Sequence, residues 1–137
     1  MKKILVVQPL HPKALALLDS REDVTYELLP DHSEERLLHS VASADAIAIR
    51  DAPISKAVLA RANGLKVIAR HGVGFDNIPV DYCSERGIPV AVVGPVNAVA
   101  VAEHTMFLLL AAARVGVELD AAVREGSFAA RGEVRSV

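Results

Sequence analysis

The stretch LKVIARHGVGFDNIPVDYCSERGIPVAVV, residues 65–93, contains two strand-like runs with a helical run between them. Leu65–Arg70 and Ile88–Val93 are short, apolar and rich in β-branched residues, as buried strands are. The segment between them carries Pro79, which suits the first turn of a helix, and stops at Gly87, which suits a helix end. A strand, a helix and a second strand in this order form a βαβ unit, in which the two strands run parallel.

The same alternation of strands and helices continues on both sides of this unit. It predicts an α/β fold: a flavodoxin-like, five-stranded parallel sheet in the order 2-1-3-4-5, with helices on both faces. After the sheet, Asn97 could cap a long C-terminal helix. The predicted strands are Lys2–Val7, Val24–Leu29, Asp45–Arg50, Leu65–Arg70 and Ile88–Val93, and the predicted helices are His11–Ser20, Ser33–Ala42, Ser55–Ala62, 79–86, Ala98–Val115 and a short one near Glu118–Glu125. We expect one domain over residues 1–116, including the long helix, and a short helix with a linker over 117–137.

The composition limits the possible functions. The chain has 137 residues, of which 52% are hydrophobic and 23% charged, so one domain with a packed core is expected. The net charge of −2 and the lack of a basic stripe argue against a nucleic-acid partner. Cys83 is the only cysteine, which excludes an internal disulfide and fits a reducing cytoplasm. The longest apolar run, Met106–Ala113, is far shorter than a membrane span, and we expect no membrane or metal partner.

The Gly-x-Gly of residues 72–74 resembles part of a dinucleotide-binding loop, G-x-G-x-x-G. Asn77 stands where the third glycine is needed, no acidic residue follows about 20 positions later, and the loop follows the fourth strand instead of the first. We therefore do not expect a dinucleotide loop. Two readings remain open: a cradle for one carboxylate or phosphate, flanked by Arg50 and Arg70, or a glycine-rich turn with Asp76 and Asn77 as local backbone caps.

Three other functional patterns are incomplete. Asp51 follows the third strand, where a phospho-acceptor receiver domain carries its aspartate, but Gln8-Pro9 replaces the acidic pair that would hold magnesium. The same segment lacks the hydroxyl groups of a flavodoxin phosphate loop. Glu103-His104 lacks the second histidine of H-E-x-x-H, so a zinc hydrolase is not expected.

Residues 50–114 resemble the substrate-binding half of the D-isomer-specific 2-hydroxyacid dehydrogenases. Three pieces carry the resemblance in order: LKVIARHGVGFDNIPVDYCSERGIPV, the turn Pro95–Asn97, and VAEHTMFLLLAAAR. The chain is most similar to the phosphoglycerate dehydrogenase and hydroxypyruvate reductase branch. The resemblance implies an enzyme of two flavodoxin-like or Rossmann-like domains that interconverts 2-hydroxy and 2-keto acids with NAD or NADP, with its active site in the cleft between them.

The resemblance also implies roles for individual residues. The backbone of the 72–74 segment would bind the substrate carboxylate, Arg50 would lie in the adjacent substrate loop, and Asn97 would lie at the cleft floor. The implied substrate-binding residues are Arg50, Gly72, Val73, Gly74 and Asn97, and the implied contacts to the nicotinamide end of the cofactor are Val73 and Val101. Asp51 replaces a small hydroxyl residue common at this place, which argues against phosphate-bearing substrates.

No catalytic residue is expected in these 137 residues. In the family, the catalytic arginine, the glutamate–histidine pair and the G-x-G-x-x-G loop lie in a nucleotide-binding domain, and GEVRSV at 132–137 resembles the lead-in to it. We therefore expect a fragment, inactive alone, of a cytoplasmic enzyme that forms a homodimer. Two alternatives without catalysis are a stand-alone carboxylate-binding module and a regulatory domain that dimerises through the apolar 98–115 helix.

Overall fold

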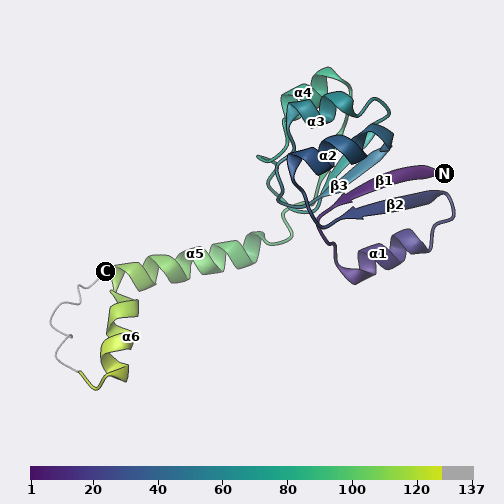
Figure 1. The fold of residues 1–137 in the computed structure, drawn as a ribbon. Helices are drawn as coiled ribbons and strands as arrows, with labels where there is room; N and C mark the ends of the chain where they lie inside the picture. The colour runs from purple at the N-terminus through teal and green to yellow at the C-terminus, as the bar shows by residue number, and fades with distance from the viewer. Residues whose placement is uncertain (128–137) are drawn as a thin grey trace. The chain divides into compact units, whose positions relative to one another are not determined.

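The computed structural model describes residues 1–127, which form helices and strands in the predicted alternation. The chain divides into two compact units, Met1–Gly94 and Pro95–Val137. The first unit contains β1 (Lys2–Val7), α1 (Pro12–Asp19), β2 (Val24–Leu29), α2 (Glu34–Ser40), a 3-10 turn η1 (Val41–Ser43), β3 (Ala46–Ile49), α3 (Lys56–Arg61), β4 (Val67–Arg70), α4 (Val80–Glu85) and β5 (Val90–Val92), and the second contains α5 (Ala98–Ala113) and α6 (Gly116–Arg124) (Figure 1).

The five strands form one parallel sheet in the order β2-β1-β3-β4-β5, as the sequence predicts. The first two strands have the predicted bounds, whereas β3, β4 and β5 are each two or three residues shorter than their apolar runs. A residue counts as part of a strand only where it pairs with a neighbouring strand. An apolar run is therefore longer than its strand wherever the neighbouring strand ends first. The register pairs Ile49 of β3 with Arg70 of β4.

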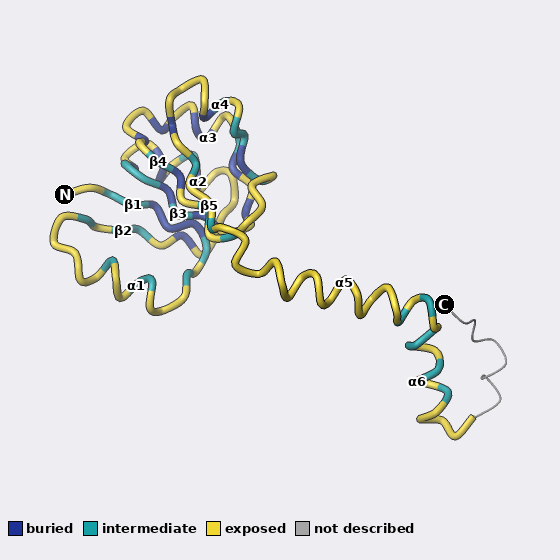
Figure 2. The backbone as a smooth tube through the Cα atoms, turned by 180° about the vertical axis from the view of Figure 1, so that it is seen from behind, coloured by how far each residue is buried: buried dark blue, intermediate teal, exposed yellow. Residues whose placement is uncertain are grey.

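One face of the sheet carries most of the hydrophobic core. Helices α2, α3 and α4 lie together on that face and α1 lies on the other (Figure 1). Leu37, Leu59 and Cys83, one from each of the three helices, are buried together with strand residues such as Ile47 and Ile68 (Figure 2). Each fully buried aliphatic side chain of this kind stabilises the fold by roughly 1.5–3 kcal/mol.

The opposite face of the sheet is less covered near β4 and β5. Ala69 and its ladder partner Ala91 alternate with the core-facing Ile68 and Val90, so they point away from the core cluster. Both alanines are exposed. Helices thus lie on both faces, as predicted, and within the unit Met1–Gly94 the second face is covered by the short helix α1.

The second unit has no buried residue in either of its helices. Asn97 occupies the N-cap position of α5, but its side chain makes no capping hydrogen bond. Val115, with a left-handed φ of 52°, separates α5 from α6, so α5 ends two residues earlier than predicted and α6 starts earlier than the predicted 118. No helix of residues 1–127 is long and apolar enough to cross a membrane. Most of the predicted linker, including GEVRSV, lies outside the described residues.

Candidate functional site

The carboxyl ends of the parallel strands bring two segments side by side: residues 50–54, which we call the 50–54 loop, and residues 71–74, which we call the 71–74 turn. Because Ile49 pairs with Arg70, Arg50 and His71 leave the sheet next to each other. The His71 N–H donates to the Ile49 carbonyl over 2.7 Å and fixes this juxtaposition. Ligands of open α/β sheets bind at this edge.

The backbone of the 71–74 turn leaves two N–H groups free. The Gly72 N–H donates to the Arg70 carbonyl over 2.9 Å, and the Gly72 carbonyl accepts from the Val93 N–H over 3.1 Å. Both backbone groups of Gly72 therefore bond within the protein. The N–H groups of Val73 and Gly74 donate no hydrogen bond to any group of residues 1–127. Both residues are exposed. Two adjacent unused donors on an exposed backbone can bind a carboxylate.

The first of the two glycines has a φ of 158° and lies against the side chain of Arg70. Its Nη1 donates to the His71 carbonyl over 2.8 Å, which places the guanidinium against the turn. A Cβ added to Gly72 would lie 1.2 Å from Nη1, whereas a Cβ added to Gly74 would meet only the Asp76 carboxylate at 3.6 Å. Arg70 therefore supports the turn from within and does not extend to a ligand, as the sequence hypothesis of a flanking cation would require.

Gln8 holds the 50–54 loop from the end of β1. Its Oε1 accepts from the N–H groups of Asp51 (3.1 Å) and Ala52 (2.9 Å), and its Nε2 donates to the Asp51 carboxylate over 2.7 Å. Gln8 has a left-handed φ of 75°, a conformation that costs roughly 1 kcal/mol or more for a residue other than glycine. In the sequence, Gln8 served only to exclude a receiver domain, and its bonds to the 50–54 loop were not predicted. Its place directly after a buried strand was the available signal.

Asn77 holds the same loop from the other side. Its Nδ2 donates to the carbonyls of Arg50 (3.1 Å) and Ala52 (2.7 Å), and its own carbonyl accepts from the Ile54 N–H over 3.0 Å. The side chain at the position of the missing third glycine thus bonds to a loop more than 20 residues away. It is not the local backbone cap that one of the two open readings supposed.

The two charged side chains at the start of the 50–54 loop are both exposed. Arg50 Nη1 donates to the Pro9 carbonyl over 3.3 Å. The hydrogen bond from Gln8 lowers the pKa of the Asp51 carboxyl below its ordinary value, and the nearby charges of Arg50 and Arg70 lower it further. Asp51 is therefore ionised at neutral pH.

Four of the predicted site residues come together at this edge: Arg50, Gly72, Val73 and Gly74. The other two, Asn97 and Val101, belong to the second unit, where the Val101 N–H donates to the Asn97 carbonyl over 2.9 Å in the first turn of α5. Val101 is 55% exposed. Within the described residues, no group of three or more His, Cys, Asp or Glu side chains is arranged to hold a metal ion.

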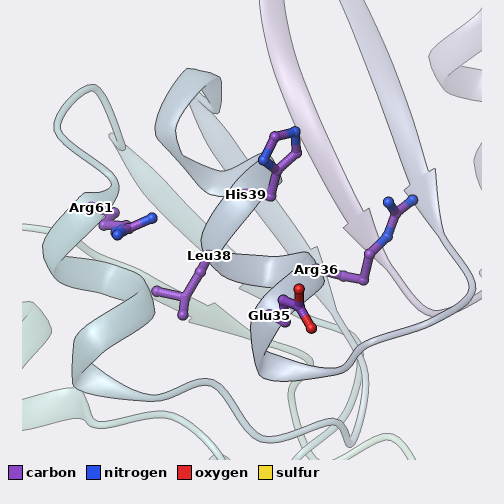
Figure 3. Close-up of a pocket in the computed structure, with 5 residues that line it drawn as sticks. All are labelled: Glu35, Arg36, Leu38, His39 and Arg61. Atoms are coloured by element: carbon purple, nitrogen blue, oxygen red, sulfur yellow. The ribbon is translucent and has the colours of Figure 1, made fainter.

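A separate hollow of about 410 Å³ lies beside α2 and α3, away from these strand ends. Arg36 and His39 come from α2 and Arg61 from α3, with Glu35 and Leu38 completing the lining (Figure 3). The side chains of Arg36 and Arg61 point in different directions in this view, so the cations do not converge on one ligand position. The strand-end site is the better candidate.

Comparison with known proteins identifies the family of the chain. The family model for the D-isomer specific 2-hydroxyacid dehydrogenase catalytic domain matches residues 4–134. The chain belongs to this family. The D-3-phosphoglycerate dehydrogenase of Methanocaldococcus jannaschii is 38% identical over 129 residues, which cover 93% of this chain and 24% of the relative. The hydroxypyruvate reductase of Thermotoga maritima is 32% identical over 128 residues, 92% of this chain and 41% of the relative.

Solved structures of the family share the fold. The NAD-dependent formate dehydrogenase of Staphylococcus aureus, solved in complex with NAD, is 27% identical with a TM-score of 0.77, over 92% of this chain and 43% of that one. The D-lactate dehydrogenase of Aquifex aeolicus, solved with NAD and lactic acid, has a TM-score of 0.82 at 21% identity, over 98% and 40%. The chain thus spans about a quarter of the length of the phosphoglycerate dehydrogenase relative. It spans less than half the length of the two dehydrogenases of known structure.

Proposed function

We propose that this chain is the substrate-binding domain of an NAD(P)-dependent oxidoreductase that acts on the CH–OH group of small D-2-hydroxy acids and reduces the matching 2-keto acids. The proposal rests chiefly on one observation: the unused N–H groups of Val73 and Gly74 at the carboxyl edge of the sheet. Membership of the family supports it. In this proposal the chain alone is inactive, because the catalytic arginine, glutamate and histidine of the family would lie in a nucleotide-binding domain.

The substrate carboxylate would accept hydrogen bonds from Val73 and Gly74, with the Gly72 backbone shaping the turn. Arg50 in the adjacent loop would contribute a positive charge, and Asn97 would contact the substrate from the second unit. Holding an acid by its carboxylate fixes the carbon that carries the hydroxyl group, and positioning of this kind accounts for a large part of enzymatic rate enhancement. The turn and the 50–54 loop would therefore orient the substrate.

The described residues do not suit the phosphates of a dinucleotide. Asn77, at the third glycine position, bonds to the 50–54 loop, and α4 begins only at Val80, eight residues after Gly72. Val73 and Val101, whose side chains are both exposed, would instead contact the nicotinamide end of the cofactor. We propose that NAD or NADP, which carries the hydride, is bound mainly by a nucleotide-binding domain that supplies the catalytic arginine, glutamate and histidine.

The remaining parts of the proposal concern organisation. Residues 1–116, including the long helix, would form the substrate-binding domain, and residues 117–137 would lead toward the nucleotide-binding domain. The active enzyme would be a cytoplasmic homodimer. Sedimentation of the protein expressed from its complete reading frame would test the dimer.

The direct test is a spectrophotometric assay of the protein from the complete reading frame with D-glycerate and NAD⁺ or NADP⁺, and with hydroxypyruvate and the reduced cofactors. We expect turnover of at least one pair. Gly74→Val should raise the KM for the acid, because a β-branched side chain would cover the two N–H donors. An unchanged KM in this variant would overturn the carboxylate cradle.

One observation favours a second candidate, a regulatory domain that dimerises through α5. Phe107, Leu108, Leu109 and Leu110 are all more than half exposed, so α5 is apolar around its circumference. The two candidates differ in the assay described above. A protein that dimerises but neither turns over nor binds any 2-hydroxy acid would favour the regulatory role.

A further inference from the structure

Asp51 is the only carboxylate of the 50–54 loop, and it is held in place. Gln8 donates to its carboxylate over 2.7 Å and also fixes its backbone N–H over 3.1 Å. An exposed aspartate normally samples several rotamers, whereas this one is confined by a side chain that itself has a strained backbone. The negative charge therefore has a defined position at the carboxyl edge of the sheet.

The positive charge at this edge is already matched. Arg50 and Arg70 lie at the ends of β3 and β4, and each donates to a backbone carbonyl of the protein, Pro9 and His71 respectively. Two carboxylates lie close by in the sequence: Asp51 belongs to the 50–54 loop, and Asp76 follows the 71–74 turn by two residues. Neither of the two forms an ion pair within the described residues. Two cations against two carboxylates leave no excess of positive charge.

The lysine closest in sequence to the 50–54 loop, Lys56, does not change this count. Lys56 lines a hollow together with two carboxylates, Asp76 and Asp81. Sites that recognise a phosphate group present clustered arginines or lysines with free N–H donors. The strand-end site offers instead two neutral backbone donors beside the single guanidinium of Arg50, which suffice for one carboxylate.

We infer that Asp51, positioned by Gln8, is a specificity-determining residue that makes this site select 2-hydroxy acids with a single anionic group over acids that also carry a phosphate. The inference rests on the proposed function. It narrows the substrate class to acids with a neutral substituent, because a dianion near the fixed Asp51 carboxylate is repelled while a neutral hydroxyl group is not.

The experiment compares D-glycerate with 3-phospho-D-glycerate, two acids that differ only in the phosphate, in the protein from the complete reading frame with its preferred cofactor. The wild type should show the higher kcat/KM with D-glycerate. Asp51→Asn keeps the shape and removes the charge, and it should raise the ratio of kcat/KM for the phosphorylated acid to that for D-glycerate by about tenfold at low salt. Asp51→Ser should act in the same direction. The gain should shrink as ionic strength rises, because salt screens exposed charges.

Two further variants separate charge from structure. Asp45→Asn removes the same charge from the opposite end of β3, where the carboxylate bonds to Lys2 and to the Lys3 N–H, and it should leave the ratio unchanged. Gln8→Leu removes all three bonds to the loop and should raise the KM for both acids similarly, without the selective gain for the phosphorylated one.

The possible failures are distinguishable. If the wild type turns over no 2-hydroxy acid, the proposed function is wrong and the inference falls with it. If the wild type is active but prefers 3-phospho-D-glycerate, or if its ratio is the same in Asp51→Asn, the inference alone is wrong. A ratio that also shifts in Asp45→Asn would show a general charge effect and would equally overturn it.

Discussion

The 50–54 loop is held by side chains that reach it from distant parts of the chain, whereas the 71–74 turn is held by its own backbone and by the adjacent Arg70. The side chains of Gln8 and Asn77 make five hydrogen bonds to the loop from its two sides. Four of these bonds join backbone groups of the loop, and one joins the Asp51 carboxylate. The turn depends on Gly72, which leaves room for the guanidinium of Arg70. The stability of the loop should therefore be sensitive to loss of these polar side chains, and the stability of the turn to gain of a side chain at Gly72.

The largest effect is expected from Asn77→Ala. It leaves the carbonyls of Arg50 and Ala52 without their donor, and Ala52 is buried. Unpaired buried groups of this kind cost about 1–3 kcal/mol each, so urea denaturation should show a loss of about 2–3 kcal/mol in the free energy of unfolding. Asn63→Ala is a matched control, because the exposed Asn63 side chain makes no hydrogen bond within the described residues, and it should stay within about 0.5 kcal/mol of wild type. If the two variants lost the same free energy of unfolding, the hydrogen bonds of Asn77 would not stabilise the 50–54 loop.

Gly72→Ala should come next. The new Cβ would overlap Nη1 of Arg70, so the flexible guanidinium must leave the turn, and alanine rarely adopts the φ of 158° at this position. We expect the two effects together to cost about 1–2 kcal/mol in the free energy of unfolding. In the double variant Gly72→Ala/Arg70→Ala the overlap no longer exists. The two changes should therefore be non-additive in a thermal or urea denaturation cycle, with the double variant more stable than the sum of the single variants predicts. Additivity would show that Arg70 and Gly72 act independently.

Gly74→Ala should be milder than Gly72→Ala. Its Cβ meets only the Asp76 carboxylate at an ordinary contact distance of 3.6 Å, so the free energy of unfolding should change by less than about 0.5 kcal/mol. Its KM for the acid should lie between those of the wild type and Gly74→Val, since a methyl group covers less of the backbone than an isopropyl group. Steady-state kinetics of the three proteins would test this order. A destabilisation as large as that of Gly72→Ala would erase the difference between the two glycines.

The sequence predicted the sheet well because strand order follows from periodic apolar runs and right-handed crossovers. The end of α4 was predicted correctly from Gly87, because glycine is the residue that most often ends a helix in the left-handed conformation. Gly87 has a left-handed φ of 65° after α4. The site was harder to predict. The sequence places Arg50 and Gly72 at one edge, but it cannot show that Gln8 and Asn77 bond to the same loop, since those bonds join residues that are 25 to 44 positions apart. Side-chain direction at the strand ends is set by tertiary contacts that no local pattern encodes.

The smallest effect concerns the titration of Asp51, and it tests only the hydrogen bond from Gln8 to the 50–54 loop. The Gln8 amide stabilises the ionised carboxylate and so lowers its pKa from the ordinary 3.8. A lowered pKa in the folded state means that this bond contributes fully above the ordinary pKa and is lost as pH falls through the lower folded value. In Gln8→Leu the pKa of Asp51 should therefore move up toward 3.8, which carboxyl ¹³C NMR can follow. Asp23, whose pKa is lowered mainly by its hydrogen bond with Arg21, is the internal reference and should not move. If the Asp51 pKa is the same in both proteins, Gln8 does not bond to the carboxylate in solution. The 50–54 loop would then not differ from the 71–74 turn through this side-chain bond.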